Sequence, residues 1–600
     1  MSAVIDIQDL WVEARSSGGD FHPIVEGVSV SVHPGEVVAL IGESGSGKTT
    51  TALSAMAYSK PGCRIVGGSI KLNGRDLLEL TPEERRQLRG REAAYVAQSA
   101  ASAFNPAIRI GDQVIESTII HNLMPRDEAL RQAVEMYQRL DLPESGQLSN
   151  RYPHQVSGGQ LQRLMAAMAM SSSPSLLILD EPTTALDVTT QISVLSAFKE
   201  LIKGQNTAAI YVTHDLAVVA QIADRIIVMQ NGKVMETGST AEIISRPQNP
   251  YTQTLMAAVR PPPKSMSFEG LEDTQAASDS IIRVNSLTAG YGRTKKKIVL
   301  RDVSLDVPRG KVVGVIGESG CGKSTLARVI AGLLPQVSGE IFHHGENLRD
   351  TAKRRTRDVL KNIQIVFQMP DVAVNPRHRV REILGRPLHL FMGLDVGARE
   401  SRIDELLELV ELPASYKTRF PGELSGGEKQ RINLARALAA EPELILCDEV
   451  TSALDTVVGK AIIDLLKKLQ TNLGVAYLFI SHDLSTVASF ADQVVVLYAG
   501  RVVEQGSLAS VLAPPFHPYT RLLLASVPEL RTDWLDGVVA SKTHLDHLGQ
   551  LVDGNAVGCP FFNRCASAVA DVCNRHDPPL REASQGHTVA CHLELDSLHM

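Results

Sequence analysis

Three short apolar runs recur in each half of the chain, and polar residues or glycine follow each of them. They are EVVALIG (36–42), LLILDE (176–181) and AAIYVTHD (208–215), then KVVGVIG (311–317), LILCDE (444–449) and AYLFISHD (476–483). Strands that are apolar on both faces are typical of a parallel sheet covered by helices on both sides. A helix-rich segment separates the first two runs of each set. The pattern predicts an α/β fold with a helical subdomain, present twice.

The two halves are a tandem repeat. Asp180 and Asp448, and His214 and His482, are each 268 residues apart, as are the two PYT tripeptides at 250–252 and 518–520. A fixed offset between several landmarks indicates duplication. The segment between the halves is rich in Pro, Ser, Asp and Glu and has no periodicity, as in a linker. We predict one domain at 4–260, a linker at 261–280, a second domain at 281–520 and an extension at 521–600.

Composition makes some classes of function less favoured. The net charge is −7 and 44% of the residues are hydrophobic, so no overall basic field favours nucleic acid. The N-terminus lacks the pattern of a secretory signal, and no run of about 18 apolar residues favours a membrane span. We expect a cytosolic chain that reaches a membrane only through partners.

Two glycine-rich loops follow the first strand of each half, GESGSGKT (42–49) and GESGCGKS (317–324). Both fit GxxxxGK[ST], in which glycines let backbone N–H groups surround phosphate oxygens and the lysine reaches the outer phosphates. A ligand-free turn would not explain two copies with matching downstream motifs. The nucleotide is therefore assigned to Gly42, Ser44, Gly45, Ser46, Gly47, Lys48, Thr49, Thr50, Gly317, Ser319, Gly320, Cys321, Gly322, Lys323, Ser324 and Thr325.

An Asp–Glu pair ends the second strand of each half. Asp180 and Asp448 suit a carboxylate near Mg²⁺, which Thr49 and Ser324 would bind through their hydroxyls. The glutamates that follow, Glu181 and Glu449, are candidates to position the attacking water. Alone, such a pair would read as a solvated loop or a helix cap, but its place after a phosphate loop favours catalysis.

Two further stretches, VSGGQLQR (156–163) and LSGGEKQR (424–431), resemble the signature motif of ATP-binding cassette (ABC) ATPases. The resemblance covers about residues 4–520 and includes Gln98 and Gln368, the ALD segments at 185–187 and 453–455, and the two histidines. It implies two nucleotide-binding cassettes, each a RecA-like core with a helical subdomain. Each glutamine would bind Mg²⁺, sense the γ-phosphate and link the cassette to a transmembrane partner. Each histidine would bind the γ-phosphate.

In that family each ATP lies between the phosphate loop of one cassette and the signature of the other. The resemblance thus implies two composite sites. Site one joins Lys48, Gln98, Glu181 and His214 to Ser425, Gly426, Gly427 and Glu428. Site two joins Lys323, Gln368, Glu449 and His482 to Ser157, Gly158, Gly159 and Gln160.

The sequence departs from the family pattern in three places. Tyr291 fits the aromatic that stacks on adenine in the second cassette, but Ala14 takes that place in the first, where Phe21 is a substitute. The second signature has Glu428 where Gln is usual, and the first begins with Val156 rather than Leu. We expect site one to be the weaker site, and both sites to hydrolyse ATP because both glutamates are present.

The extensions RPQNPYTQTL (246–255) and PPFHPYTRLL (514–523) resemble those of oligopeptide and dipeptide importer ATPases. That resemblance implies an ATP-hydrolysing motor at the cytoplasmic face of the membrane, one copy per complex. Its partners would be two transmembrane permease subunits and an extracytoplasmic solute-binding protein. Peptides are the default solute, although near relatives carry glutathione, nickel chelates or peptide antibiotics.

Four of the seven cysteines, Cys559, Cys565, Cys573 and Cys591, crowd the end of the chain. In a reducing compartment such a cluster favours a metal site over disulfides. Their spacing leaves Zn²⁺ and an iron–sulfur cluster equally open, with a metal-free tail as the third reading. Similarity to the importer tails, several of which bind [4Fe–4S], favours the cluster.

A soluble dual-cassette ATPase that acts on ribosomes is the rival function. Such proteins usually have a longer, charged, helical linker, which 261–280 does not resemble. Ribosome-recycling ABC proteins have N-terminal iron–sulfur cysteines, which this chain lacks. An exporter motor is disfavoured by the cysteine tail and both PYT extensions, and a scaffold by the intact motor residues.

Overall fold

The computed structural model describes residues 2–16, 19–183, 186–259, 280–292, 296–452, 454–540 and 557–598. The chain forms two compact units. The first contains residues 1–259 and 528–551, and the second contains residues 260–527 and 552–600. Residues 261–279 of the predicted linker lie outside the described residues, and Ser280 already begins a strand. Among the described helices, none has the length and apolar character needed to cross a bilayer.

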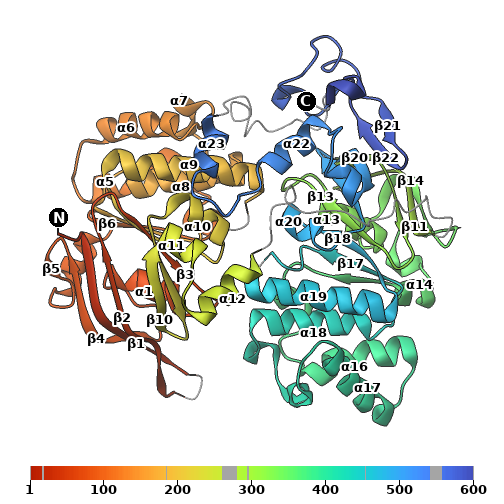
Figure 1. Ribbon diagram of the computed structural model, residues 1–600, viewed down its shortest axis with the longest axis horizontal. Helices are drawn as coiled ribbons and strands as arrows, with labels where there is room; N and C mark the ends of the chain where they lie inside the picture. Colours follow the sequence, from red (N-terminus) through yellow and green to blue (C-terminus); the bar gives the residue numbers. More distant parts are fainter. Residues whose placement is uncertain are drawn as a thin grey trace. The chain divides into compact units, whose positions relative to one another are not determined.

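A six-stranded sheet, in the order β10-β9-β3-β8-β7-β6, forms the core of the first unit (Figure 1). Its strands are β3 (Val37–Ile41), β6 (Ala93–Val96), β7 (Leu176–Asp180), β8 (Ala208–Val212), β9 (Arg225–Gln230) and β10 (Lys233–Ser239). The central three are buried at every residue. Strands β3 and β7 lie on either side of β8 and pair with it in parallel. Val37 of β3 and Leu177 of β7 both lie opposite Ala209 of β8. The continuous apolar runs therefore form the parallel sheet that the sequence predicts.

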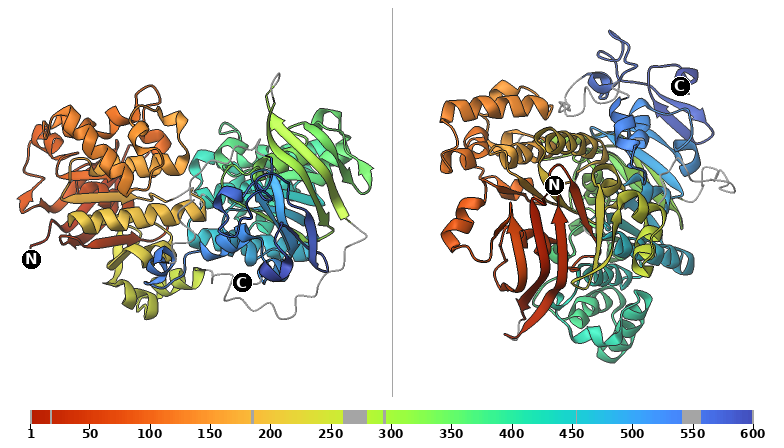
Figure 2. Two further views of the ribbon diagram at one scale, coloured as in Figure 1. Left: turned by 90° about the horizontal axis from the view of Figure 1, so that it is seen from above. Right: turned by 60° about the vertical axis from the view of Figure 1, so that its left-hand side comes forward.

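A second, antiparallel sheet in the same unit has the order β2-β1-β4-β5, and Figure 2 (right) brings it forward in red. Its strands are β1 (Ile5–Arg15), β2 (Phe21–Val32), β4 (Cys63–Leu72) and β5 (Arg75–Asp76). Their inward residues join one apolar core with the parallel sheet and α1. The helices of the unit are α1 (Lys48–Ser54), α2 (Pro82–Leu88), α3 (Ala100–Ala103), α4 (Ile110–Val114), α5 (Glu116–Ile120), α6 (Arg126–Arg139), α7 (Ser145–Leu148), α8 (Gly158–Met170), α9 (Val188–Gln205), α10 (Leu216–Ile222), α11 (Thr240–Ser245) and α12 (Pro250–Ala258).

The second unit repeats this plan, with an antiparallel sheet β12-β11-β14-β15 and a longer main sheet β16-β17-β18-β13-β19-β20-β22-β21. Its strands are β11 (Ser280–Tyr291), β12 (Lys297–Pro308), β13 (Val312–Ile316), β14 (Gln336–His343), β15 (Glu346–Asn347), β16 (Ile363–Val366), β17 (Leu444–Asp448), β18 (Ala476–Ile480), β19 (Gln493–Tyr498) and β20 (Arg501–Ser507). Its α-helices are α13 (Lys323–Ile330), α14 (Arg357–Asn362), α15 (Pro370–Ala373), α16 (Val380–Pro387), α17 (Val396–Leu409), α18 (Gly426–Leu438), α19 (Thr456–Leu473), α20 (Leu484–Ala488), α21 (Leu508–Val511) and α22 (Pro518–Ala525). The structure thus confirms the expected α/β fold, present twice.

The predicted C-terminal extension divides between the two units. Its last part adds the hairpin β21 (Leu580–Ser584) and β22 (His587–Ala590) to the main sheet of the second unit, with Glu504 opposite Val589. Residues 528–540 instead belong to the first unit and include α23 (Trp534–Ala540). Trp534 is 3% exposed and packs in the helical core of the first unit.

Buried polar contacts fix this returning segment. The Gln221 side-chain amide donates to the carbonyls of Glu529 and Arg531 and accepts from the Leu535 N–H at 3.0 Å. Lys199 pairs with Asp536 at 2.6 Å. Trp534 and Gln221 therefore fix residues 528–540 on the first unit. The hydrophobic periodicity of the sequence does not predict this placement.

Candidate functional site

Each phosphate loop joins a buried strand to a helix and turns on glycines. Gly42, Gly45 and Gly47 have φ of 147°, 83° and 94°, values that L side chains rarely adopt. A Cβ on Gly42 would lie 2.1 Å from the Met229 carbonyl oxygen. In the second loop, a Cβ on Gly317 would lie 2.1 Å from the equivalent oxygen of Leu497. Backbone conformation and packing therefore both require glycine at the start of each loop.

Both loop lysines are buried and reach back over their own loops. The Lys48 ammonium group donates to the carbonyls of Gly42 at 2.8 Å and Glu43 at 2.7 Å. Lys323 does the same to Gly317 at 2.7 Å and Glu318 at 3.1 Å. A desolvated ammonium held on weak carbonyl acceptors gains by exchanging them for charged phosphate oxygens.

Of the residues predicted to bind Mg²⁺, Thr49 and Ser324 each meet the aspartate of their own cassette, whereas Gln98 and Gln368 contact the glutamates. The Thr49 hydroxyl donates to Asp180 at 3.0 Å, and the Ser324 hydroxyl donates to Asp448 at 2.7 Å. Hydroxyl and carboxylate oxygens side by side are the donor set that Mg²⁺ takes, so these residues fit the ion. In the first cassette, the Tyr95 hydroxyl also donates to Asp180 at 2.9 Å.

Each candidate catalytic glutamate is held by the glutamine and the histidine of its own cassette. The Gln98 amide donates to Glu181 at 2.8 Å, and His214 Nδ1 lies 2.9 Å from the other carboxylate oxygen. In the second cassette, the Gln368 amide donates to Glu449 at 2.8 Å. The structure thus brings together the three side chains predicted to act on the γ-phosphate.

The two glutamates share a strained backbone but differ in their histidine contacts. Both have φ of 49°, an uncommon value for a residue with a side chain. His482 Nδ1 lies 3.5 Å from Glu449, and Lys323 approaches the same carboxylate at 3.9 Å. Burial tends to raise the pKa of Glu449, but His482 and Lys323 outweigh it and lower that pKa, which keeps the carboxylate ionised.

The signature residues begin a helix in each cassette. Ser157 caps α8 by accepting from the Gln160 N–H at 3.3 Å, and the Gln160 side chain accepts from the Ser157 N–H at 3.0 Å. Glu428 makes the same reciprocal contacts with Ser425 at the start of α18. Either side chain completes a capping box, so Glu428 preserves the local structure of the signature.

The two signature glycines have different roles. A Cβ on Gly159 would lie 2.3 Å from the Thr190 side chain, and one on Gly427 would lie 2.5 Å from Val458. A Cβ on Gly158 would meet nothing within 4 Å in its own cassette. The second glycine is therefore required by packing, and the first leaves the helix N-terminus open to an anion. Of the ALD segments, Ala185 and Ala453 lie outside the described residues.

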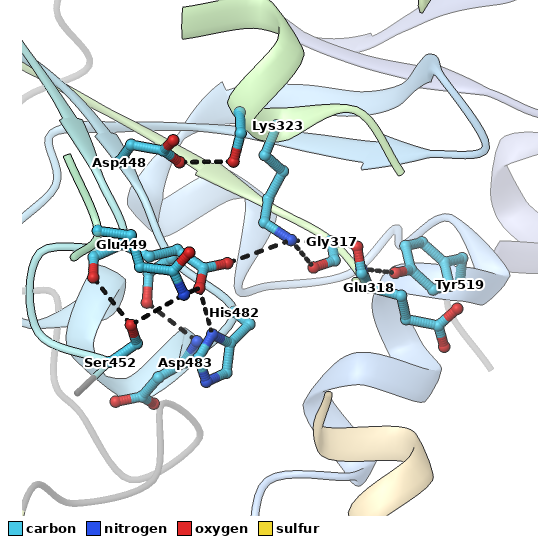
Figure 3. A network of polar contacts seen from close by, with 12 residues as sticks. Gly317, Glu318, Lys323, Asp448, Glu449, Ser452, His482, Asp483 and Tyr519 are labelled. Atoms are coloured by element: carbon cyan, nitrogen blue, oxygen red, sulfur yellow. Dashed lines mark hydrogen bonds and ion pairs between the residues drawn. The ribbon is translucent and has the colours of Figure 1, made fainter. Parts of the chain in front are cut away.

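The tyrosines of the PYT extensions lie at the phosphate loops, a contact that sequence reasoning missed. The Tyr251 hydroxyl accepts from the Glu43 N–H at 3.0 Å, and the Tyr519 hydroxyl accepts from the Glu318 N–H at 2.8 Å (Figure 3). Proline begins both helices, α12 and α22. The PYT tripeptides recur at the same offset as the Asp180/Asp448 and His214/His482 pairs, and this was the signal that could have marked them as part of each cassette.

The cysteine tail also reaches the second phosphate loop. Arg564, next to Cys565, makes two hydrogen bonds to the Glu318 carboxylate, at 2.7 and 2.8 Å. The Arg564 side chain is only 7% exposed. No sequence pattern marks Arg564, because the pair spans 246 residues.

The candidate adenine contacts differ between the cassettes. Tyr291, at the end of β11, is 41% exposed, and its hydroxyl lies 3.3 Å from Thr325 of α13. Ala14 lies on β1. In that cassette Phe21 stacks against the Arg64 guanidinium at 3.9 Å. One face of Phe21 is therefore already covered.

The four tail cysteines converge as free thiols. The Cys559 N–H donates to the Cys573 carbonyl at 2.7 Å. Burial raises the pKa of Cys559 to about 12 and that of Cys565 to about 11, and the other thiols of the set add to each effect. Four thiols, two of them buried and two half-buried, fit a metal centre whose positive charge would favour the thiolates.

Comparison with known proteins identifies both parts of each half. The ABC transporter family model matches residues 25–184 and 300–452. The model described as oligopeptide/dipeptide transporter, C-terminal region, matches residues 235–282 and 503–573. These matches confirm the resemblance carried by the motifs and by the two PYT extensions.

Curated relatives match across most of the chain. The glutathione import ATP-binding protein GsiA of Salmonella choleraesuis (strain SC-B67) is 38% identical over 538 residues, 84% of this chain and 86% of that protein. GsiA of Escherichia coli O157:H7 is 37% identical over 540 residues with the same coverage. Among solved structures, cbiO1 of Clostridium perfringens, part of the ABC transporter complex cbiONQ, covers 38% of this chain and 89% of that chain, at 29% identity and a TM-score of 0.35.

Proposed function

We propose a transport function because this chain belongs to the ABC transporter family. It is an ATP-binding protein with two cassettes in one polypeptide. It is an ABC-type transport ATPase. We assign it to an importer of peptides, with glutathione-sized peptides as the first class to test. It would be the motor subunit, peripheral at the cytoplasmic face of the inner membrane, and would act with two permease subunits and an extracytoplasmic solute-binding protein.

One observation carries the motor assignment: both cassettes hold the complete set of lysine, aspartate, glutamate, glutamine and histidine in nearly the same contacts. A degenerate cassette would have lost one of these contacts. Bound ATP with Mg²⁺ supplies a phosphoryl group whose developing negative charge the surrounding residues stabilise. Lys48 and Lys323 would exchange their loop carbonyls for phosphate oxygens. Thr49 and Asp180, like Ser324 and Asp448, would hold the ion.

The glutamates would act on the attacking water. Glu449 stays ionised because His482 and Lys323 lower its pKa, so it can accept a hydrogen bond from water. Gln368 and His482 both contact its Oε2 and would turn to the γ-phosphate when nucleotide enters. Glu181, Gln98 and His214 have the corresponding roles in the first cassette.

We infer that each site becomes complete only with the signature of the other cassette. The open helix N-termini at Ser157–Gly158 and Ser425–Gly426 support this assignment, because each offers unsatisfied N–H groups to an anion. Closure driven by two bound ATP molecules would then move the permeases, and hydrolysis would reset the pair.

The four tail cysteines are proposed to hold a [4Fe–4S] cluster. Their thiols lie close enough to raise one another's pKa, which supports a common metal centre. The resemblance of this tail to those of importer ATPases favours an iron–sulfur cluster over zinc. Iron and acid-labile sulfide analysis of anaerobically purified protein tests this. Loss of both in Cys565→Ser is the expected result, and stoichiometric zinc without sulfide would exclude the cluster.

Purification from host membranes tests the importer proposal. Tagged chain extracted in detergent should bring down two multi-span proteins, and vesicles containing this complex should take up labelled glutathione or dipeptides when ATP is supplied. The Glu181→Gln/Glu449→Gln variant should assemble equally well but take up nothing. Recovery of ribosomes without integral membrane proteins would favour the translation-related alternative.

A further inference from the structure

A histidine pair and a glutamate meet in the second cassette, away from the nucleotide residues. His343 is the last residue of β14, His344 follows it in the hairpin turn, and Glu443 immediately precedes β17. His344 Nε2 lies 2.6 Å and His343 Nε2 lies 3.5 Å from the same oxygen of Glu443. One ligand atom from each of the three residues lies within 4.8 Å of the others.

The β14–β15 hairpin turn explains how the adjacent residues His343 and His344 can both direct their rings toward Glu443. Side chains of consecutive strand residues normally point to opposite faces. His343 pairs with Glu346, which leaves a two-residue loop of His344 and Gly345 with φ of 50° and 80°. Positive φ at both positions is characteristic of a type I′ hairpin. The turn swings the His344 ring beside that of His343, with 4.3 Å between ring centroids.

Burial separates this group from an ordinary surface ion pair. A hydrogen bond between His344 and Glu443 would by itself need no ligand. His343, however, is 7% exposed, and its Nε2 makes no hydrogen bond to any part of the chain that the structure describes. A buried ring nitrogen without a partner costs about 1–3 kcal/mol, which a metal–nitrogen bond would remove.

We propose that His343, His344 and Glu443 form a binding site for a zinc-type divalent transition-metal ion. Two imidazoles and one carboxylate are a usual zinc ligand set, and tetrahedral ligands at about 2.0–2.1 Å from the ion lie roughly 3.3 Å apart. The observed separations of 2.6 and 3.5 Å lie on either side of that value. His344 and Glu443 are each one-third exposed, so water can reach the fourth position.

One cation stands beside the site. Arg309 lies 4.0 Å from one oxygen of Glu443, and the two histidines contact the other oxygen. Arg309 therefore does not occupy the side of the carboxylate where the ion would bind.

The first cassette supplies an internal comparison. Its matching hairpin turn is Asn73–Gly74, preceded by buried Leu72, and Ser175 stands where Glu443 does. The Asn73 amide donates to Ser175 at 3.1 Å and to the Glu92 carboxylate at 3.2 Å, so direct hydrogen bonds hold the hairpin there. The ion would make the corresponding connection in the second cassette, between the β14–β15 hairpin and β17.

Zinc titration of the full chain tests the site. Chelator-treated, nucleotide-free protein would be compared with His343→Leu/His344→Asn/Glu443→Ser, which installs the residues of the first cassette and should therefore fold. We expect the wild type to bind one more Zn²⁺ per chain than the variant, in competition with a chromophoric chelator. His344→Asn alone should lower the affinity for this Zn²⁺ ion by more than roughly 10–100-fold, which is the loss expected when a residue that only supports a metal ligand is removed.

The tail cysteines are the same in both proteins, so any metal that they bind cancels and the difference between the two isolates the new site. Co²⁺ provides a second readout: the extra ion should add visible d–d bands without a thiolate charge-transfer band. Zn²⁺ should also raise the melting temperature of the wild type more than that of the variant. Equal zinc stoichiometry in the two proteins, or an extra cobalt ion with thiolate bands, would overturn the proposal.

Discussion

The Arg564–Glu318 ion pair connects the cysteine tail to the phosphate loop of the second cassette, and its removal should loosen both. Arg564→Leu would leave the Glu318 carboxylate, whose side chain is 17% exposed, without its two charged hydrogen bonds. Breaking one side of a buried pair costs about 3–5 kcal/mol. The middle of that range corresponds to roughly 10³-fold in an opening equilibrium, since each 1.36 kcal/mol is tenfold.

Hydrogen exchange of the intact chain measures this opening locally, which suits a protein with several domains. Amides of residues 558–565 and of the phosphate loop at 317–323 should exchange faster in Arg564→Leu by about that factor. Arg575→Leu is the matched control, because its pair with Asp571 is exposed and costs at most about 1 kcal/mol.

A double-mutant cycle separates the pair from general disruption of the tail. Glu318→Gln combined with Arg564→Leu removes both charges, so the second change should cost much less once the first is present. Additive effects of the two single changes, or exchange in Arg564→Leu no faster than in Arg575→Leu, would refute the coupling.

Three further predictions concern other parts of the chain. Trp534→Ala should destabilise docking of the returning segment by about 3–5 kcal/mol and expose residues 529–536 to protease, and an unchanged cleavage pattern would contradict this. Glu181→Gln together with Glu449→Gln should lower phosphate release by about 10²–10⁴-fold while ATP is still bound and retained. Burial lowers the pKa of His517 to about 3, whereas the pKa in the unfolded chain is about 6.5. Burying the neutral ring therefore contributes fully to stability above about pH 6.5, and this contribution is lost as the pH falls below that value. The tail should therefore weaken by roughly 2 kcal/mol between pH 6.5 and 5, and His517→Asn, which copies Asn249 at the matching cap, should remove that loss in a pH series of thermal melts.

The fold and most of the site follow from local sequence because their determinants lie close together along the chain. Continuous apolar runs specify buried parallel strands, and the glycines of 42–47 allow the loop conformation that phosphate binding needs. The capping box that begins α8 spans only four residues. Tyr95 escaped notice because its contact with Asp180 depends on the register of two neighbouring strands.

The sequence by itself determined the duplication and the class of each cassette, and it supplied the residues proposed to face the nucleotide. Each of these depends on short contiguous motifs. Tertiary structure alone decided contacts between residues far apart in the chain. Arg564 finds Glu318, Gln221 holds the returning segment, and Tyr519 meets its loop because folding brings distant backbone segments together. Hydrophobic periodicity indicates which face of a helix or strand packs against the core. It does not indicate which distant residues that face will contact.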